Sequence, residues 1–84
     1  MKGRFGIPRI VRLPFGYKVK VVQKTLKELA VLAGDAVYGL WVVDEMTIYI
    51  AKNLPMWKKR ETFVHEFKHA LNDWEHDLRE IGKS

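Results

Sequence analysis

The sequence predicts a small α+β domain in which a twisted sheet packs against one long helix. Apolar and charged residues alternate over residues 17–21, which is typical of a strand with one buried face. Between residues 63 and 81, apolar residues recur within an arc of about 100°, the width of a core-facing helical stripe. A short helix and a hairpin separate these segments, so the predicted order is β-α-β-β-α.

The 84 residues are expected to form one domain. Residues 1–16 contain three glycines and two of the three prolines, which predicts an irregular basic arm with at most a short edge strand at residues 9–13. Thr25 and Glu28 match a capping box ahead of a helix over residues 26–33, and Gly34 is placed to end that helix.

Two β-rich runs follow, at residues 38–43 and 46–51, and the short Asp44-Glu45 segment between them predicts a hairpin. If the second run forms the sheet edge beside the long helix, it can hold an extended peptide by strand addition. The alternation in this run places three apolar residues on one face. They are Met46, Ile48 and Ile50.

The long helix is expected to begin near Asn53, a possible N-cap, with Pro55 close behind, and to end at Gly82. All three histidines of the chain fall on the side opposite the apolar stripe. The stripe itself consists of Phe63, Phe67, Ala70, Leu71, Trp74, Leu78 and Ile81.

Within this helix, residues 65–69 read His-Glu-Phe-Lys-His, the HExxH pattern. Side chains at i and i+4 point about 40° apart and one turn apart, so the imidazoles of His65 and His69 can bind one ion. Zn²⁺ takes neutral histidine nitrogens at about 2.0–2.1 Å, and the glutamate of this pattern acts as general base rather than as a ligand. The sequence therefore predicts Zn²⁺ on His65 and His69, with Glu66 catalytic. The alternative is three ordinary polar residues on an exposed helix.

A third zinc ligand must be a histidine or a carboxylate, because the chain has no cysteine. We predict His76 in this role, although on a straight helix it lies about 10 Å along the axis from His69. It joins the pair only if the helix bends near Asn72; otherwise it is a candidate oxyanion stabiliser. Glu75, Asp73, water or another chain remain open as the third ligand. Asp73 also suits a carboxylate that orients His69.

The chain resembles a minimal zincin, similar to the small metallopeptidase-like proteins of phages and mobile elements near the ImmA/IrrE group. The resemblance covers residues 17–77 and rests on His65, Glu66 and His69, with weaker similarity in their flanks. It implies a zinc metallopeptidase that hydrolyses peptide bonds through a zinc-activated water with Glu66 as base. Tyr38 or Tyr49 is then expected to assist at the oxyanion. Trp57 and Trp74 are interpreted as packing residues.

Charge is distributed unevenly within a net charge of +5. Residues 1–27 hold eight Lys or Arg and no acid, whereas residues 28–84 hold seven basic and ten acidic residues. We interpret the basic region as a solvated or internally paired face. The competing hypothesis is an inactive zincin-shaped module that contacts nucleic acid or an acidic protein through that region.

No stretch approaches the roughly 20 apolar residues of a membrane span, and residues 1–12 lack the apolar run of a secretory signal. We therefore expect a cytoplasmic protein that acts on a peptide or protein substrate, with no membrane partner. The low content of Asn and Gln among many charged residues leans toward a thermophilic source.

Overall fold

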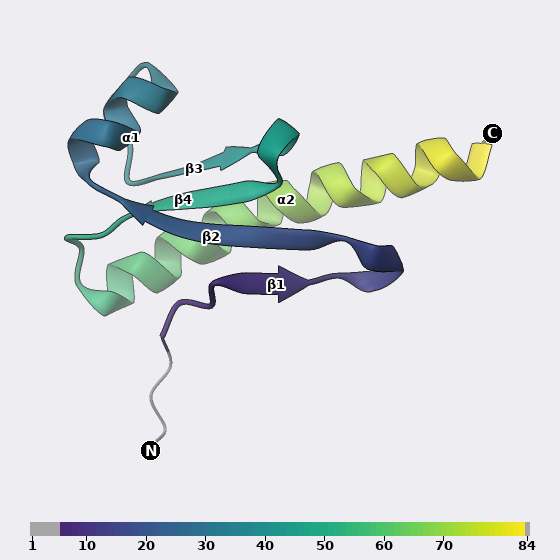
Figure 1. Ribbon diagram of the computed structural model, residues 1–84, viewed down its shortest axis with the longest axis horizontal. Helices are drawn as coiled ribbons and strands as arrows, with labels where there is room; N and C mark the ends of the chain where they lie inside the picture. The colour runs from purple at the N-terminus through teal and green to yellow at the C-terminus, as the bar shows by residue number, and fades with distance from the viewer. Residues whose placement is uncertain (1–5, 84) are drawn as a thin grey trace.

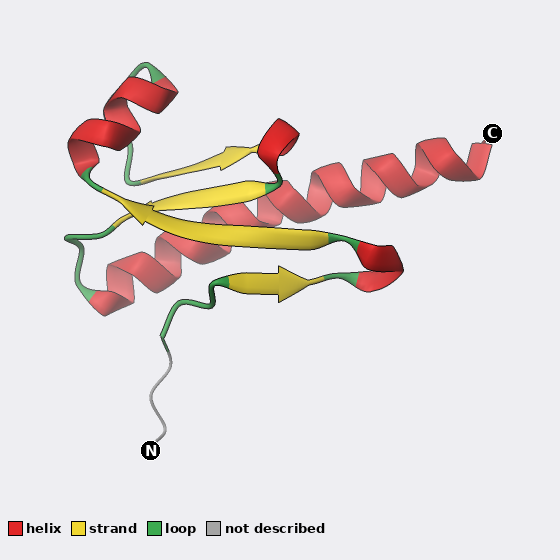
Figure 2. Cartoon of the chain, in the orientation of Figure 1, coloured by secondary structure: helices red, strands yellow, loops and turns green. Residues whose placement is uncertain are grey.

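The computed structural model describes residues 6–83 and has the predicted α+β fold, with a four-stranded mixed sheet and two helices (Figures 1 and 2). Most of the expected irregular arm is described; residues 1–5 lie outside the described part. The elements in chain order are β1 (Ile10–Arg12), a 3₁₀ turn (Pro14–Gly16), β2 (Lys18–Lys24), α1 (Leu26–Ala33), β3 (Gly39–Val42), a second 3₁₀ turn (Val43–Glu45), β4 (Thr47–Ala51) and α2 (Met56–Lys83).

The strand order in the sheet is β1-β2-β4-β3. β2 is antiparallel to β1 and parallel to β4, and β4 is antiparallel to β3. The second run of the predicted hairpin is therefore an interior strand, and the edge strand beside α2 is β3, so the condition for strand addition to residues 46–51 is not met. The reason is the parallel pairing of β4 with β2, which places β4 between β2 and β3. In this position Ile48 and Ile50 are fully buried on one face, and Thr47 and Ala51 are buried on the other.

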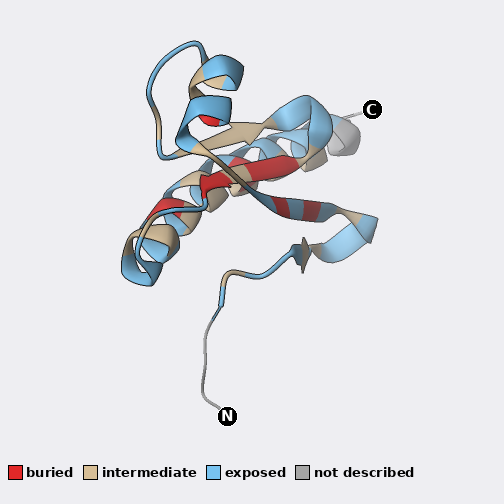
Figure 3. Cartoon of the chain, turned by 60° about the vertical axis from the view of Figure 1, so that its left-hand side comes forward, coloured by how far each residue is buried: buried red, intermediate tan, exposed pale blue. Residues whose placement is uncertain are grey.

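The hydrophobic core lies between one face of the sheet and the first part of α2. β2 and β4 contribute Val19, Val21, Ile48 and Ile50, and α2 contributes Ala70. Figure 3 shows these buried segments as red bands on the two central strands and on the helix. Phe63 and Phe67 of the predicted stripe pack against the same cluster, with ring centroids 5.4 Å apart. The side chain of Ile81, the last member of the stripe, lies outside the described residues.

The short helix α1 has the predicted bounds and the predicted capping box. Thr25 Oγ1 accepts the amide N–H of Glu28 at 3.1 Å, and the Glu28 carboxylate accepts the amide N–H of Thr25 at 3.0 Å. These hydrogen bonds stabilise the ionised carboxylate and lower the pKa of Glu28. Gly34 ends the helix with φ of 79°, a conformation that glycine adopts without steric cost. Leu29 buries this helix against β3 and β4.

The long helix differs from the prediction at both ends. It begins at Met56, and the carbonyl of Pro55 accepts the amides of Lys58 and Lys59, so Asn53 lies outside it. It also runs through Gly82 to Lys83, because one glycine costs a helix only about 1 kcal/mol relative to alanine. In the part of the chain that the structure describes, no helix combines the length and the apolar character that crossing a membrane requires.

Candidate active site

The HExxH motif lies in the part of α2 that crosses β3 and β4. His65 and His69 are exposed, while Glu66 between them is half-buried. The two imidazole rings have centroids 5.1 Å apart and planes inclined at 84°. The structure therefore brings the two predicted ligands together on the solvent side of the helix.

This separation fits two ligands of one zinc ion. With Zn–N bonds of about 2.0–2.1 Å and a tetrahedral angle of about 109°, two imidazole centroids are expected about 5 Å apart. The donor set is also suitable, because neutral imidazole nitrogen is a preferred zinc ligand. The pair can therefore hold one side of a zinc site without rearrangement of the helix.

Glu66 is positioned by a glycine on the edge strand. A Cβ atom built on Gly39 would lie 3.2 Å from Glu66 Cγ and would collide with the Thr62 methyl group, Cγ2. Only a residue without a side chain lets α2 approach β3 this closely. Gly39 thus lets the side chains of Thr62 and Glu66 lie against the edge of the sheet, and its role was not predicted from the sequence. The available signal was an isolated glycine at the start of a β-rich run, which can mark a close backbone approach.

A groove of about 380 Å³ runs along this contact. At one side of it, Lys58 Nζ lies 5.3 Å from the centroid of the Tyr38 ring and forms a 2.7 Å salt bridge with Glu61. The groove joins the motif to the segment that leads into β3. Its lining residues are Val37, Tyr38, Gly39, Lys58, Glu61, Thr62, His65 and Glu66.

The structure does not bring His76 to the other two histidines. α2 is a single helix from Met56 to Lys83 and passes through Asn72 without interruption. His76 instead lines a separate cavity of about 260 Å³ together with Tyr17, Met46 and Trp74. Among residues 6–83, no three His, Asp or Glu side chains are grouped so that they could hold a metal ion.

Asp73 and Tyr49, two other candidates for the site, form hydrogen bonds with side chains outside it. Asp73 Oδ2 accepts a 2.6 Å hydrogen bond from the Trp41 indole Nε1, which ties α2 to the end of β3. Tyr49 lies on the sheet face opposite α2, since its neighbours Ile48 and Ile50 face the helix. Its hydroxyl donates to Glu45 Oε1 at 2.5 Å, and this hydrogen bond raises the pKa of Tyr49. Tyr38 is therefore the tyrosine that shares the groove with Glu66.

The two tryptophans expected to serve in packing differ from each other. Trp74 meets Tyr17 edge to face at 6.5 Å between centroids, and its indole Nε1 is buried with no hydrogen-bond partner within residues 6–83. Trp57 is 65% exposed at the start of α2, so it contributes little to the core.

The chain matches no protein-family model, no curated protein and no solved structure. The resemblance to zincins therefore rests on the HExxH motif and on the elements around it.

Proposed function

We propose that this protein is a zinc-dependent metallopeptidase. The observation that supports the proposal is the pair of imidazoles on α2, 5.1 Å apart, with Glu66 between them beside an unpaired sheet edge. If His65, Glu66 and His69 were only an exposed polar helix face, the neighbouring strand would not need a glycine to make room for the half-buried side chain of Glu66.

His65 and His69 would hold the zinc ion. When bound, zinc polarises a carbonyl oxygen and lowers the pKa of water to about 7. The described residues group no third protein ligand with this pair, so the remaining positions fall to water or to a group outside residues 6–83. The site would then be more open than one with three protein ligands.

Glu66 would carry the proton transfers. Its carboxylate accepts a proton from the attacking water as the new C–O bond forms, and it delivers that proton to the leaving amine nitrogen as the C–N bond breaks. The Tyr38 hydroxyl in the same groove is a candidate donor to the carbonyl oxygen of the scissile bond.

An extended peptide or protein segment is the proposed substrate. β3 is an edge strand, so one side of its backbone is available for strand addition. Gly39 belongs to this strand and faces Glu66, so a peptide paired along β3 would pass close to the proposed base.

The test is Glu66→Gln, assayed with a broad library of quenched fluorescent peptides in the presence of zinc. The substitution preserves size and removes the proton acceptor, so hydrolysis should fall by at least about 100-fold while zinc binding is retained. Asp44→Asn is the control, since it removes an exposed carboxylate that does not line the groove. Equal cleavage by wild type and Glu66→Gln would end the peptidase hypothesis.

A further inference from the structure

The sheet face opposite α2 carries a row of cations across β1 and β2. Side chains alternate along β2, so Val19 and Val21 face the helix core while the intervening lysines face the other way. Arg12 pairs with Lys18 in the β1–β2 register and shares that face. We call this set the basic strip. It consists of Arg12, Lys18, Lys20 and Lys24.

No packed helix covers the basic strip. α2 lies behind the sheet in Figure 1, and α1 packs mainly on β3 and β4. Lys18 and Lys20 are exposed, and the apolar residues beside them are open as well, with Ile10 49% and Val22 37% exposed. In Figure 3 the exposed positions of β2 appear as blue bands between the buried red ones.

The charges of the strip are largely unpaired. Within residues 6–83, Arg12, Lys18 and Lys20 take part in no salt bridge. Lys24 Nζ lies 5.7 Å from the Tyr49 ring centroid and near Glu28, and Glu45 accepts the Tyr49 hydroxyl. Like charges directly opposite each other in a sheet are destabilising, so the Arg12 and Lys18 pair has a cost that an anionic partner would remove.

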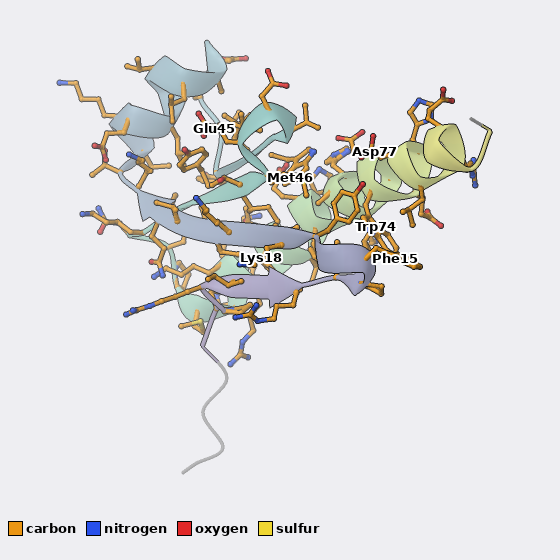
Figure 4. All side chains as sticks on the ribbon, turned by 45° about the vertical axis from the view of Figure 1, so that its right-hand side comes forward. Phe15, Lys18, Glu45, Met46, Trp74 and Asp77 are labelled. Atoms are coloured by element: carbon orange, nitrogen blue, oxygen red, sulfur yellow. The ribbon has the colours of Figure 1, made fainter. Side chains whose placement is uncertain are left out.

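An exposed aromatic ring lies at the end of the strip. Phe15 occupies the turn between β1 and β2, is 79% exposed, and has a φ of 68°. The left-handed conformation is unfavourable for an aromatic residue, and no packing compensates for it here. Figure 4 shows Phe15 at the turn beyond Lys18, at the end of the sheet.

We propose that the basic strip and Phe15 bind single-stranded nucleic acid. Alternate residues of a strand repeat at about 6.6–6.8 Å, so Lys18 and Lys20 are one repeat apart and Lys24 lies two repeats beyond Lys20, with Val22 between them. Together with Arg12 they form a line of positive charge that can follow a phosphate backbone. Proteins that bind single strands combine such a track with aromatic rings on which bases stack. A duplex keeps its bases stacked inside, and an acidic peptide has no bases to stack, so the exposed ring favours a single strand over both.

This binding would be independent of the peptidase site. The basic strip faces away from α2, and none of its residues lines the groove beside Glu66. Nucleic acid affinity should therefore be the same with and without zinc, and in the Glu66→Gln variant.

The test is fluorescence anisotropy with a labelled 12-nucleotide thymidine oligomer over a salt series. Four neutralised phosphates predict a slope of log affinity against log salt of about −2.8, a loss of about 50-fold between 50 and 200 mM salt. Lys18→Gln/Lys20→Gln should reduce the slope to about −1.4 and the loss to about sevenfold. Lys68→Gln/Arg79→Gln removes the same charge from α2 and should leave the slope unchanged.

Phe15→Asn removes the ring with a residue that tolerates the left-handed conformation. It should weaken binding about five- to 150-fold at constant salt without changing the slope, as expected for one lost stacking contact. Lys18→Arg/Lys20→Arg should bind like wild type, and circular dichroism should show an unchanged fold in every variant. Equal weakening in the α2 control, or equally tight binding of a 12-base-pair duplex or a poly-glutamate peptide, would overturn the proposal.

Discussion

The two halves of α2 are attached to the sheet by different interactions. Residues 56–70 are held by apolar burial, with Phe67 and Ala70 in the core and Thr62 against Gly39. Among the described side chains, those of residues 71–80 are held largely by two hydrogen bonds and one contact between aromatic rings. They are the Trp41–Asp73 and Tyr17–Asp77 hydrogen bonds, at 2.6 and 2.8 Å, and the edge contact of Tyr17 with Trp74.

The difference teaches that residues on one face of a helix need not form one site. His65, His69 and His76 share a side of α2, yet only the first two lie in the half that is packed closely on β3 and β4. The motif residues of the candidate active site lie within residues 56–70, where apolar residues pack α2 on the sheet. The contacts of the residues after 70 fix only the course of the rest of the helix.

The largest expected effect is on zinc affinity. His65→Ala and His69→Ala should each weaken zinc binding by more than about 100-fold, because each would remove a ligand itself rather than a group behind one. His76→Ala, Asp73→Ala and Glu75→Ala should each bind zinc about as well as wild type, since α2 does not bend toward the pair. Competition titration against a chelator measures all five. A selective loss in His76→Ala or Glu75→Ala would show that the helix bends in solution.

A smaller effect is expected where the first half meets the edge strand. Gly39→Ala should destabilise the protein by about 1–3 kcal/mol, because its methyl group overpacks the contact with Thr62. Thr62→Ser removes the obstructing methyl, so the double variant should recover much of the loss. Urea denaturation of the four proteins measures the coupling. Independent, additive effects would contradict the close approach of α2 to β3.

The second half should be less sensitive to mutation. Trp41→Phe removes the indole donor to Asp73 and should cost about 0.5–1.5 kcal/mol, the usual net value of one hydrogen bond. Zinc affinity should be unchanged in this variant. A stability loss accompanied by weaker zinc binding would mean that the two halves are coupled.

The smallest effect concerns pH. The hydrogen bond to Asp77 raises the pKa of Tyr17 above its ordinary value of 10.0, because the carboxylate favours the neutral hydroxyl. A raised folded-state pKa means that this contact contributes fully below about pH 10 and is lost as the pH rises through the folded value. Tyrosinate absorbance, taken as the difference between wild type and Tyr17→Phe, should show the shift. Asp77→Asn should lower the Tyr17 pKa, and an unchanged value would exclude this hydrogen bond.

Local patterns predicted most of the fold. The capping box at Thr25 and Glu28 and the terminating Gly34 gave the bounds of α1, and the apolar stripe of α2 identified the packed face, because these signals depend only on near neighbours. The order of strands was not predictable in this way. Whether β3 or β4 forms the edge depends on the parallel pairing of β2 with β4, a contact between distant segments.

The residues of the candidate site also differ in whether local spacing or contacts between distant segments determine their positions. The spacing within one helix was sufficient to place His65 and His69 together. The roles of Gly39 and Trp41 depend on how β3 meets α2, which no spacing in the sequence encodes. The need for a third zinc ligand favoured a bend near Asn72, whereas the continuous apolar stripe in the sequence favoured a straight helix. The structure has a single helix from Met56 to Lys83.

The close approach at Gly39 has a consequence for how such proteins diverge. Addition of one methyl group at this position would leave every letter of the HExxH motif intact and still move the glutamate away from the strand that is proposed to hold the peptide. A lineage could thus lose the proposed hydrolytic activity through a residue that no motif search inspects. Surveys that count enzymes by the motif alone would continue to include its descendants.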